Sequence, residues 1–248
     1  MPKLNDATML QDKLQTNHYG YSAVRPADLG ASEYTLVGIA IDSSPSVAAF
    51  KAELENCLKS IVQACKFSPR ADNLLLRIVQ FNGRMEEIHG FKLLERCNVG
   101  DYDNALDIRG ATALFDSAEN VISSTTDYAH NHLAPHRYQA NAIIFVVTDG
   151  EDNSSKLSAF SVRAALERAV AEEDLESVVS ILVGVNVNNP KMSRYLNDFY
   201  TKAGFSQYIE LGNASAKELA KLAAFVSRSI SAQSQSLGTG GPSQLLTF

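Results

Sequence analysis

Residues 34–46 read Tyr-Thr-Leu-Val-Gly-Ile-Ala-Ile-Asp-Ser-Ser-Pro-Ser, and this stretch decides the fold. Its first nine residues form an apolar, β-branched run that ends in a carboxylate, which is typical of a buried strand. Pro45 suits the first turn of a helix, where its missing N–H costs little. Apolar residues then recur at spacings of three and four from Val47 to Cys65, which predicts a helix of about five turns. The stretch therefore opens an α/β fold.

The same alternation of strand and helix continues along the chain. The turn Asn82-Gly83 lies between two apolar runs and predicts a hairpin, which makes one edge strand antiparallel. We therefore predict an α/β class with a mainly parallel, six-stranded sheet and about six helices covering both faces. Beyond residues 34–42, the predicted strands are 74–81, 86–94, 142–147, 178–185 and 207–211, and the predicted helices lie within 113–133, 162–170, 192–201 and 215–230.

The chain is expected to form one domain with two extensions. Its 248 residues, 45% of them apolar, suffice for one core, which we assign to residues 34–230. Residues 1–33 show little periodicity and are predicted to be an N-terminal extension. Residues 231–248 are rich in Ser, Gln and Gly and are predicted to be a flexible tail. An alternative is that the apolar end of this tail docks on a partner or a neighbouring copy through Leu245, Leu246 and Phe248.

Composition excludes several classes of function. Acidic residues outnumber basic ones, 28 to 22, and the net charge of −6 argues against a nucleic-acid partner. No apolar run approaches the roughly 20 residues that span a bilayer, and residues 1–6 lack the apolar core of a secretory signal. Three cysteines without close pairing disfavour a disulfide framework or a zinc knuckle. These features predict a cytoplasmic protein without a membrane partner.

Oxygen-bearing side chains gather at three places where a strand ends or a loop turns into a helix. They are Asp42, Ser44 and Ser46, then Thr112, then Asp149. The carboxyl ends of parallel strands share one edge of a sheet, where α/β proteins collect their ligand-binding groups. Hydroxyl and carboxylate oxygens are the hard ligands that Mg²⁺ prefers. Taken singly, each residue is explained as a helix cap or the polar end of a strand.

Together, the three places resemble the von Willebrand factor A domain and its metal-ion-dependent adhesion site (MIDAS). The matching motifs are Asp42-x-Ser44-x-Ser46, Gly110-x-Thr112-x-Leu114 and Thr148-Asp149-Gly150, within a resemblance that covers about residues 34–230. The resemblance implies a Rossmann-like fold. It also implies that Ser44, Ser46 and Thr112 contact the metal through hydroxyls, whereas Asp42 and Asp149 hold it largely through water. Mg²⁺ is the expected ion, with Mn²⁺ and Ca²⁺ as alternatives.

The resemblance also implies a function. Many members carry Gly before the second Ser, whereas this chain has Pro45, which stiffens the loop and keeps every ligand type. An ion held mostly by neutral hydroxyls attracts a partner's Asp or Glu. We therefore expect a non-catalytic scaffold or adaptor, similar to the stand-alone intracellular proteins associated with tellurite resistance. Such proteins work beside kinases, phosphatases or AAA-type ATPases in stress-response and defence assemblies.

Two other functions remain open. A metal-dependent phosphohydrolase also places an Asp at the end of its first strand, but such enzymes resemble Asp-x-Asp and position 44 is Ser. The chain also has no Walker-type loop and no Gly-x-Ser-x-Gly elbow. A cell-surface adhesin is the second alternative, although the signal or anchor usual for adhesins is not seen in this sequence.

Two further clusters have competing interpretations. His130, His132 and His136 suggest zinc, but spacings of two and four do not place all three on one helical face, and Pro135 interrupts the helix. We interpret them as exposed residues at a helix end. The run Glu151-Asp152-Asn153 is either a solvated loop or the rim of the metal edge.

Overall fold

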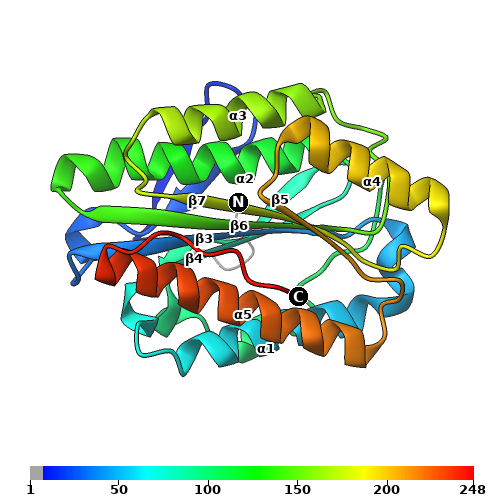
Figure 1. Cartoon of the computed structure of the whole chain (residues 1–248), viewed down its shortest axis with the longest axis horizontal. Coiled ribbons are helices and arrows are strands. Elements are labelled where there is room, and N and C mark those ends of the chain that lie inside the picture. The colour runs from blue at the N-terminus through cyan, green and yellow to red at the C-terminus, as the bar shows by residue number, and fades with distance from the viewer. Residues whose placement is uncertain (1–7) are drawn as a thin grey trace.

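The computed structural model describes residues 8–248, which form a central sheet between two layers of helices (Figure 1). One layer contains α2, α3 and α4, and the other contains α1 and α5. The strands are β1 (Leu10–Lys13), β2 (Gly20–Ala23), β3 (Glu33–Asp42), β4 (Leu74–Phe81), β5 (Met85–Leu93), β6 (Gln139–Thr148), β7 (Val178–Gly184) and β8 (Gln207–Glu210). The helices are α1 (Lys51–Lys66), α2 (Leu114–Tyr128), α3 (Ala159–Ala171), α4 (Pro190–Ala203) and α5 (Ala216–Thr239).

The α/β class and the Rossmann-like arrangement are confirmed, and all six predicted strands are present. The strand order is β1-β2-β5-β4-β3-β6-β7-β8. β3 lies between β4 and β6 and is parallel to both, and β6, β7 and β8 continue in parallel. The register pairs Ile41 with Val147 and Asp42 with Phe81. The carboxyl ends of β3, β4 and β6 therefore meet at one edge of the sheet.

The predicted strand count was wrong, because the sheet has eight strands. The two additional strands, β1 and β2, come from the segment predicted to be an N-terminal extension, and they pair antiparallel with each other. β2 runs parallel to β5 at Ala23 and Phe91, so β5 is not the edge strand. The first seven residues, on which the argument against a secretory signal also rests, lie outside the described residues. β1 (Leu-Gln-Asp-Lys) and β2 (Gly-Tyr-Ser-Ala) hold too few apolar residues to give a strand pattern in the sequence.

Five α-helices are present in the described part of the chain, rather than about six, and the last is longer than expected. Helix α5 continues to Thr239, nine residues beyond the predicted domain end at residue 230. The chain then lies back on its own domain: Gln207 Nε2 donates to the Leu246 carbonyl (3.1 Å), and the Phe225 and Phe248 rings are 5.6 Å apart. None of the helices within residues 8–248 has both the length and the apolar character needed to cross a membrane.

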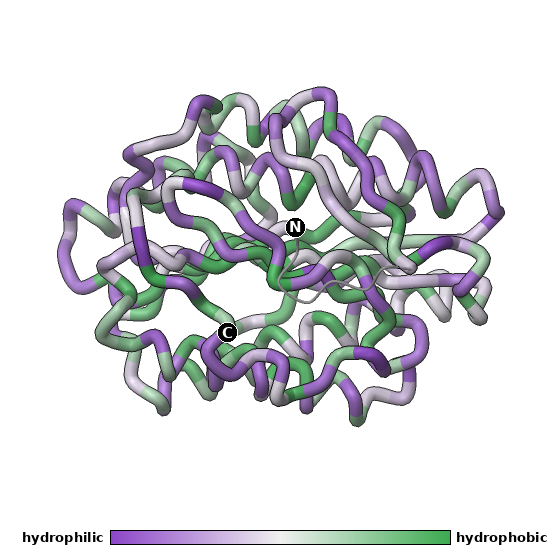
Figure 2. Tube along the Cα trace, turned by 180° about the vertical axis from the view of Figure 1, so that it is seen from behind, coloured by the Kyte–Doolittle hydropathy of each residue, from purple (hydrophilic) through white to green (hydrophobic). Residues whose placement is uncertain are grey.

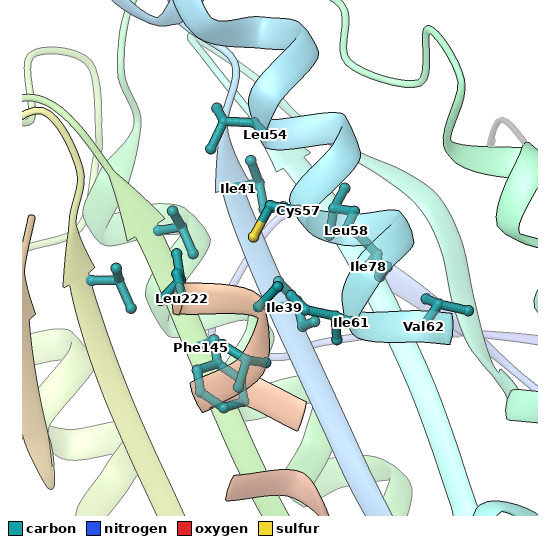
Figure 3. Packing of buried hydrophobic residues seen from close by; sticks show 14 of the residues in the cluster. Ile39, Ile41, Leu54, Cys57, Leu58, Ile61, Val62, Ile78, Phe145 and Leu222 are labelled. Carbon is teal, nitrogen blue, oxygen red and sulfur yellow. The ribbon is translucent and has the colours of Figure 1, made fainter. Parts of the chain in front are cut away.

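Two apolar layers, one on each face of the sheet, hold the fold together. Hydrophobic residues are concentrated in the central strands, as the tube in Figure 2 shows. On the α1 and α5 side, Leu58 and Ile61 of α1 pack toward Ile39 of β3 and Phe145 of β6 (Figure 3). Cys57 lies in the same layer, where burial raises the pKa of its thiol to about 12. The thiol therefore acts as a small apolar group, as the sequence predicted.

Truncating this layer is expected to destabilise the domain. Leu58 is 1% exposed, so Leu58→Ala should lower the free energy of unfolding by about 2–5 kcal/mol, because it removes apolar contacts and leaves a cavity. Urea denaturation measures this value. Leu245→Ala is the matched control: Leu245 is 51% exposed, and the change there should stay within about 0.5 kcal/mol. Equal losses at the two positions would contradict the assigned core.

Candidate metal centre

Two neighbouring parallel strands carry the carboxylates of the candidate metal centre. Asp42 is the last residue of β3, and Asp149 directly follows β6. After Asp42 the chain turns into a short 3-10 helix, η2 (Pro45–Phe50), with Pro45 in its first turn as predicted. Ser44 and Ser46 lie in this turn. The pairing of β3 with β6 therefore brings two distant sequence motifs to one corner of the sheet.

The Asp42 side chain is fixed by hydrogen bonds to both of its oxygens. The Ser44 backbone N–H donates to Oδ1 (2.8 Å), and the Thr148 hydroxyl donates to Oδ2 (2.7 Å). Asp42 is 1% exposed. The two donors offset part of the cost of burying a carboxylate and set its direction.

A chain of hydroxyls links this corner to Asp149. The Ser44 and Ser46 hydroxyl oxygens lie 2.9 Å apart, and the Ser46 hydroxyl donates to Asp149 Oδ1 (2.7 Å). Four of the five predicted ligands, Asp42, Ser44, Ser46 and Asp149, are thus in one connected set. The role of these residues as metal ligands remains a prediction.

Thr112, the fifth predicted ligand, joins the site through the loop after Asp149. The Thr112 N–H donates to Asn153 Oδ1 (2.7 Å), and the Asn153 N–H donates to the Thr112 carbonyl (3.0 Å). Asp152 accepts a hydrogen bond from the Phe115 N–H in the first turn of α2, and Glu151 forms an ion pair with Lys191. The run 151–153 therefore fastens the loops at the metal edge to one another.

A second set of contacts positions the Thr112 loop, and sequence reasoning missed it. The Arg109 N–H donates to the Ser43 carbonyl (3.1 Å), and Asn82 Nδ2 donates to Ser43 Oγ (3.2 Å). Gly110 has a φ of +73°, and a Cβ there would lie 3.3 Å from the Gly83 nitrogen. The hairpin turn after β4 therefore supports the loop that carries Thr112. Gly110 in the matched motif was the only sequence signal for this contact.

Neither site carboxylate has a basic partner within the part of the chain that the structure describes. Among residues 8–248, no Lys, Arg or His forms an ion pair with Asp42 or Asp149. Burial, with a further contribution from the charge of Asp42, raises the pKa of Asp149 to about 6, although the Ser46 hydrogen bond opposes the shift. Burial also raises the pKa of Asp42. One buried and one half-buried carboxylate, with the hydroxyls of Ser44, Ser46 and Thr148 beside them, form an oxygen-only donor set that fits a small, hard divalent cation.

The three histidines do not converge, in agreement with the helical spacing. His130 Nδ1 pairs with Asp174 (2.5 Å), His132 Nε2 pairs with Asp12 (2.9 Å), and His136 Nδ1 hydrogen-bonds the His132 carbonyl (2.9 Å). The prediction of exposed residues holds for His130 and His136 but not for His132, which is half-buried.

Comparison with known proteins agrees with this geometry. The family model described as the von Willebrand factor type A domain matches residues 37–224. Comparison with curated proteins gave no match.

Solved structures share the fold at low sequence identity. The PilB minor pilin from Streptococcus sanguinis has a TM-score of 0.59 and 15% identity, with 86% of this chain and 64% of that chain covered. The pilus adhesin SpaC from Lactobacillus rhamnosus GG has a TM-score of 0.58 and 8% identity, with 90% of this chain and 33% of that chain covered. Proximal thread matrix protein 1 from the mussel byssus, with a zinc-occupied MIDAS motif, has a TM-score of 0.54 and 18% identity. The match covers 81% of this chain and 46% of that chain. This chain therefore spans less than two thirds of the length of these proteins.

We predict that loss of the Thr148 hydrogen bond lowers the stability of the domain. Thr148→Val removes the donor to Asp42 Oδ2 at nearly constant volume, so the free energy of unfolding should fall by about 1–3 kcal/mol. Urea denaturation in EDTA measures it. Thr201→Val, at an exposed helix position, is the matched control and should change stability by less than about 0.5 kcal/mol. A loss no larger than that of the control would show that this bond does not support Asp42.

The unpaired carboxylates predict an unusual stabilising mutation. Asp149→Asn keeps an oxygen that accepts from Ser46 but removes one half-buried negative charge, so metal-free protein at pH 7 should gain on the order of 1 kcal/mol. The same variant should lose any stabilisation by Mg²⁺. Thermal melts in EDTA and in Mg²⁺ test both effects. Destabilisation in EDTA would mean that Asp149 is a structural residue rather than part of a cation site.

Proposed function

The chain belongs to the von Willebrand factor type A domain family, and from this premise we propose that it captures a protein partner through a bound divalent cation. The ligands are Asp42, Ser44, Ser46, Thr112 and Asp149. The observation that carries the proposal is the pair of carboxylates, Asp42 buried and Asp149 half-buried, that share a hydroxyl-lined corner where no basic side chain of residues 8–248 pairs with them. A bound cation would supply the positive charge that compensates these two carboxylates.

The shape of the corner supports capture of an acidic residue. Asp42, Ser44 and Thr112 are buried, whereas Ser46 is exposed and Asp149 is half-buried, so the site opens to solvent on the Ser46 side. An ion held directly by neutral hydroxyls keeps much of its positive field. A carboxylate from a partner's Asp or Glu is the complementary ligand for it.

Mg²⁺ is the ion we propose. All five side chains offer oxygen only, and Mg²⁺ accepts hydroxyl, carboxylate and water ligands. The byssus protein with a zinc-occupied MIDAS motif shows that the motif in that protein accepts another divalent ion. Mn²⁺, Ca²⁺ and Zn²⁺ are therefore competitors in the titration below.

We propose a non-catalytic role in preference to a phosphohydrolase. Both oxygens of Asp42 accept hydrogen bonds from the protein, and the residue two positions later is Ser44 rather than a second carboxylate. The site therefore lacks the acid–base partner that a nucleophilic carboxylate needs in such hydrolases.

The setting we propose is a cytoplasmic stress-response or defence assembly, with a kinase, phosphatase or AAA-type ATPase among the partners. Its supports are the resemblance of the metal motif to that group and the three buried, free thiols Cys57, Cys65 and Cys97, which suit a reducing compartment. The competing setting is the cell surface, where the pilin and adhesin that share the fold belong by their names. Fractionation of the source cells distinguishes the two settings.

The metal site is tested by calorimetric titration of Mg²⁺ into EDTA-treated, dialysed protein. Wild type should bind one ion, and the double variant Ser44→Ala with Ser46→Ala should bind none while it remains folded, because two hydroxyl ligands are gone. Ser32→Ala, an exposed position just before the opposite end of β3, is the control and should bind like wild type.

The partner role is tested with the same proteins as bait. Wild type and Ser32→Ala should retain a partner in Mg²⁺ and release it in EDTA, and the double variant should not retain it. Substitution of one Asp or Glu of that partner should abolish retention. Equal capture by all three baits in EDTA would mean that another surface recognises the partner, and loss of folding in the double variant would mean that the hydroxyls are structural caps.

A further inference from the structure

A second cluster of ligating side chains lies at the far end of helix α2. It comprises Asp12 of β1, Asp127 in the last turn of α2, and His132 just beyond the helix, with one ligand atom from each within 4.8 Å of the others. The corner formed by Asp42, Ser44, Ser46, Thr112 and Asp149 is called the MIDAS corner below. α2 has 15 residues and begins two positions after Thr112, so it separates this cluster from the MIDAS corner by about 22 Å. The two sites are therefore distinct.

A local change in helix geometry brings two of these side chains together. Residues five apart in a regular α-helix point about 140° away from each other. After α2 the chain continues through a π-helical turn, Ala129–Leu133, which is wider than an α-helical turn. Asp127 and His132 therefore lie on the same side. Their separation of five residues explains why the His spacing alone gave no signal.

The third ligand comes from the N-terminal hairpin. Asp12 lies on β1, the edge strand, and His132 Nε2 donates to Asp12 Oδ2 (2.9 Å). β1 pairs only with β2, and β2 joins the rest of the sheet at a single register pair, Ala23 with Phe91. The cluster is thus a contact that fastens a weakly paired hairpin to the body of the domain.

Neighbouring groups hold both carboxylates in place. The Tyr21 hydroxyl donates to Asp127 Oδ2 (2.7 Å), and Asn131 Nδ2 donates to Asp127 Oδ1 (3.0 Å). The Lys13 backbone N–H donates to Asp12 Oδ1 (2.8 Å). Outer hydrogen bonds of this kind orient ligands in metal sites.

The charge of the cluster is unbalanced. Two carboxylates face one imidazole, and no Lys or Arg of the described chain forms an ion pair with either of them. All three residues are half-buried, with 41% of the Asp12 side chain and 23% of the His132 side chain exposed. An ion can therefore reach the ligand atoms and keep one water as a further ligand.

We propose that Asp12, Asp127 and His132 form a zinc site that clamps the N-terminal hairpin to the end of α2. One imidazole nitrogen and two carboxylate oxygens suit Zn²⁺, whose sites combine such ligands, better than Mg²⁺, which prefers oxygen alone. On binding, Nε2 must be free of its proton: an imidazolium releases that proton to solvent and keeps its Nδ1–H, whereas a neutral ring shifts the proton to Nδ1. The site is independent of the proposed partner capture.

The neighbouring His130 cluster provides a matched comparison. It has the same kind of ligands, His130 with Glu172 and Asp174, but two of the three residues are exposed and none comes from the hairpin. The Asp12 cluster is less exposed and joins segments more than 100 residues apart in sequence. His130→Gln is therefore the control for His132→Gln.

The test is a zinc titration of the full chain in the Ser44→Ala and Ser46→Ala background, which removes competition from the MIDAS corner. One Zn²⁺ should bind per chain. His132→Gln should weaken binding by more than the roughly 10–100-fold expected for loss of an outer partner, because it removes a direct ligand. Asp12→Asn should also weaken binding, and His130→Gln should leave it unchanged. Hydrogen exchange should show zinc-dependent protection of residues 10–23, since the ion holds β1.

Three outcomes would overturn the proposal: no zinc binding in this background, binding that His132→Gln does not change, or binding lost in His130→Gln instead. If the double variant does not fold, Asp149→Asn serves as the background. Wild-type crystals soaked in zinc provide a second measurement. An anomalous peak between Asp12 and His132 supports the site, and its absence, with zinc at the MIDAS corner alone, rejects it.

Discussion

The hydrogen bond from the Thr148 hydroxyl to Asp42 joins the ends of β3 and β6, two neighbouring parallel strands, and the candidate metal centre depends on it. It exists only because β3 and β6 pair in one register. A slip of the pairing by one residue would turn every side chain of β3 to the opposite face of the sheet. That register is set by the core, since Ile39 and Ile41 face α1 while Ala40 faces α2. Apolar packing on both faces of the sheet thus decides which polar groups meet at its edge.

Helix α2 adds a second constraint, because almost all of its surface is buried although much of it is polar. Its polar side faces Arg77, which is fully buried and donates to Ser124 (2.9 Å), Asn120 (3.0 Å) and Glu87 (2.6 Å). The N-terminal segment completes this network: the Ser22 hydroxyl donates to Glu87, and Asn17 Nδ2 donates to the Asp116 carbonyl. Removing one partner from such a network leaves buried polar groups unsatisfied. Residues 17–22 therefore join the domain through polar contacts as well as through the buried Tyr21 ring, which packs edge-on against Phe91 and Tyr128.

This difference between apolar and polar stabilisation explains what could be predicted. The six strands from β3 to β8 were found because their apolar runs are visible in sequence, and the motif residues at their ends proved to be neighbours. β1, β2 and the end of α5 were missed because their own sequences are largely polar, although Tyr21, Ala23 and Leu237 are buried. Gln233, 1% exposed within the predicted flexible tail, donates to the Ala142 carbonyl and the Ser177 hydroxyl. A buried Gln in a Ser- and Gln-rich segment has no sequence signature, and neither does the pairing of Thr112 with Asn153.

The two proposed ion sites differ in where their negative charge lies, and this difference suits them to different tasks. At the MIDAS corner, the family resemblance implies that the hydroxyls would contact the ion and that the carboxylates would act largely through water. Coulomb energy falls with distance, so charges one water layer away cancel less of the ion's field than directly bound ones. At the Asp12 cluster two carboxylates would bind the ion directly and neutralise it. An ion that keeps its field attracts a partner's carboxylate, whereas a neutralised ion serves to hold two segments of its own chain together.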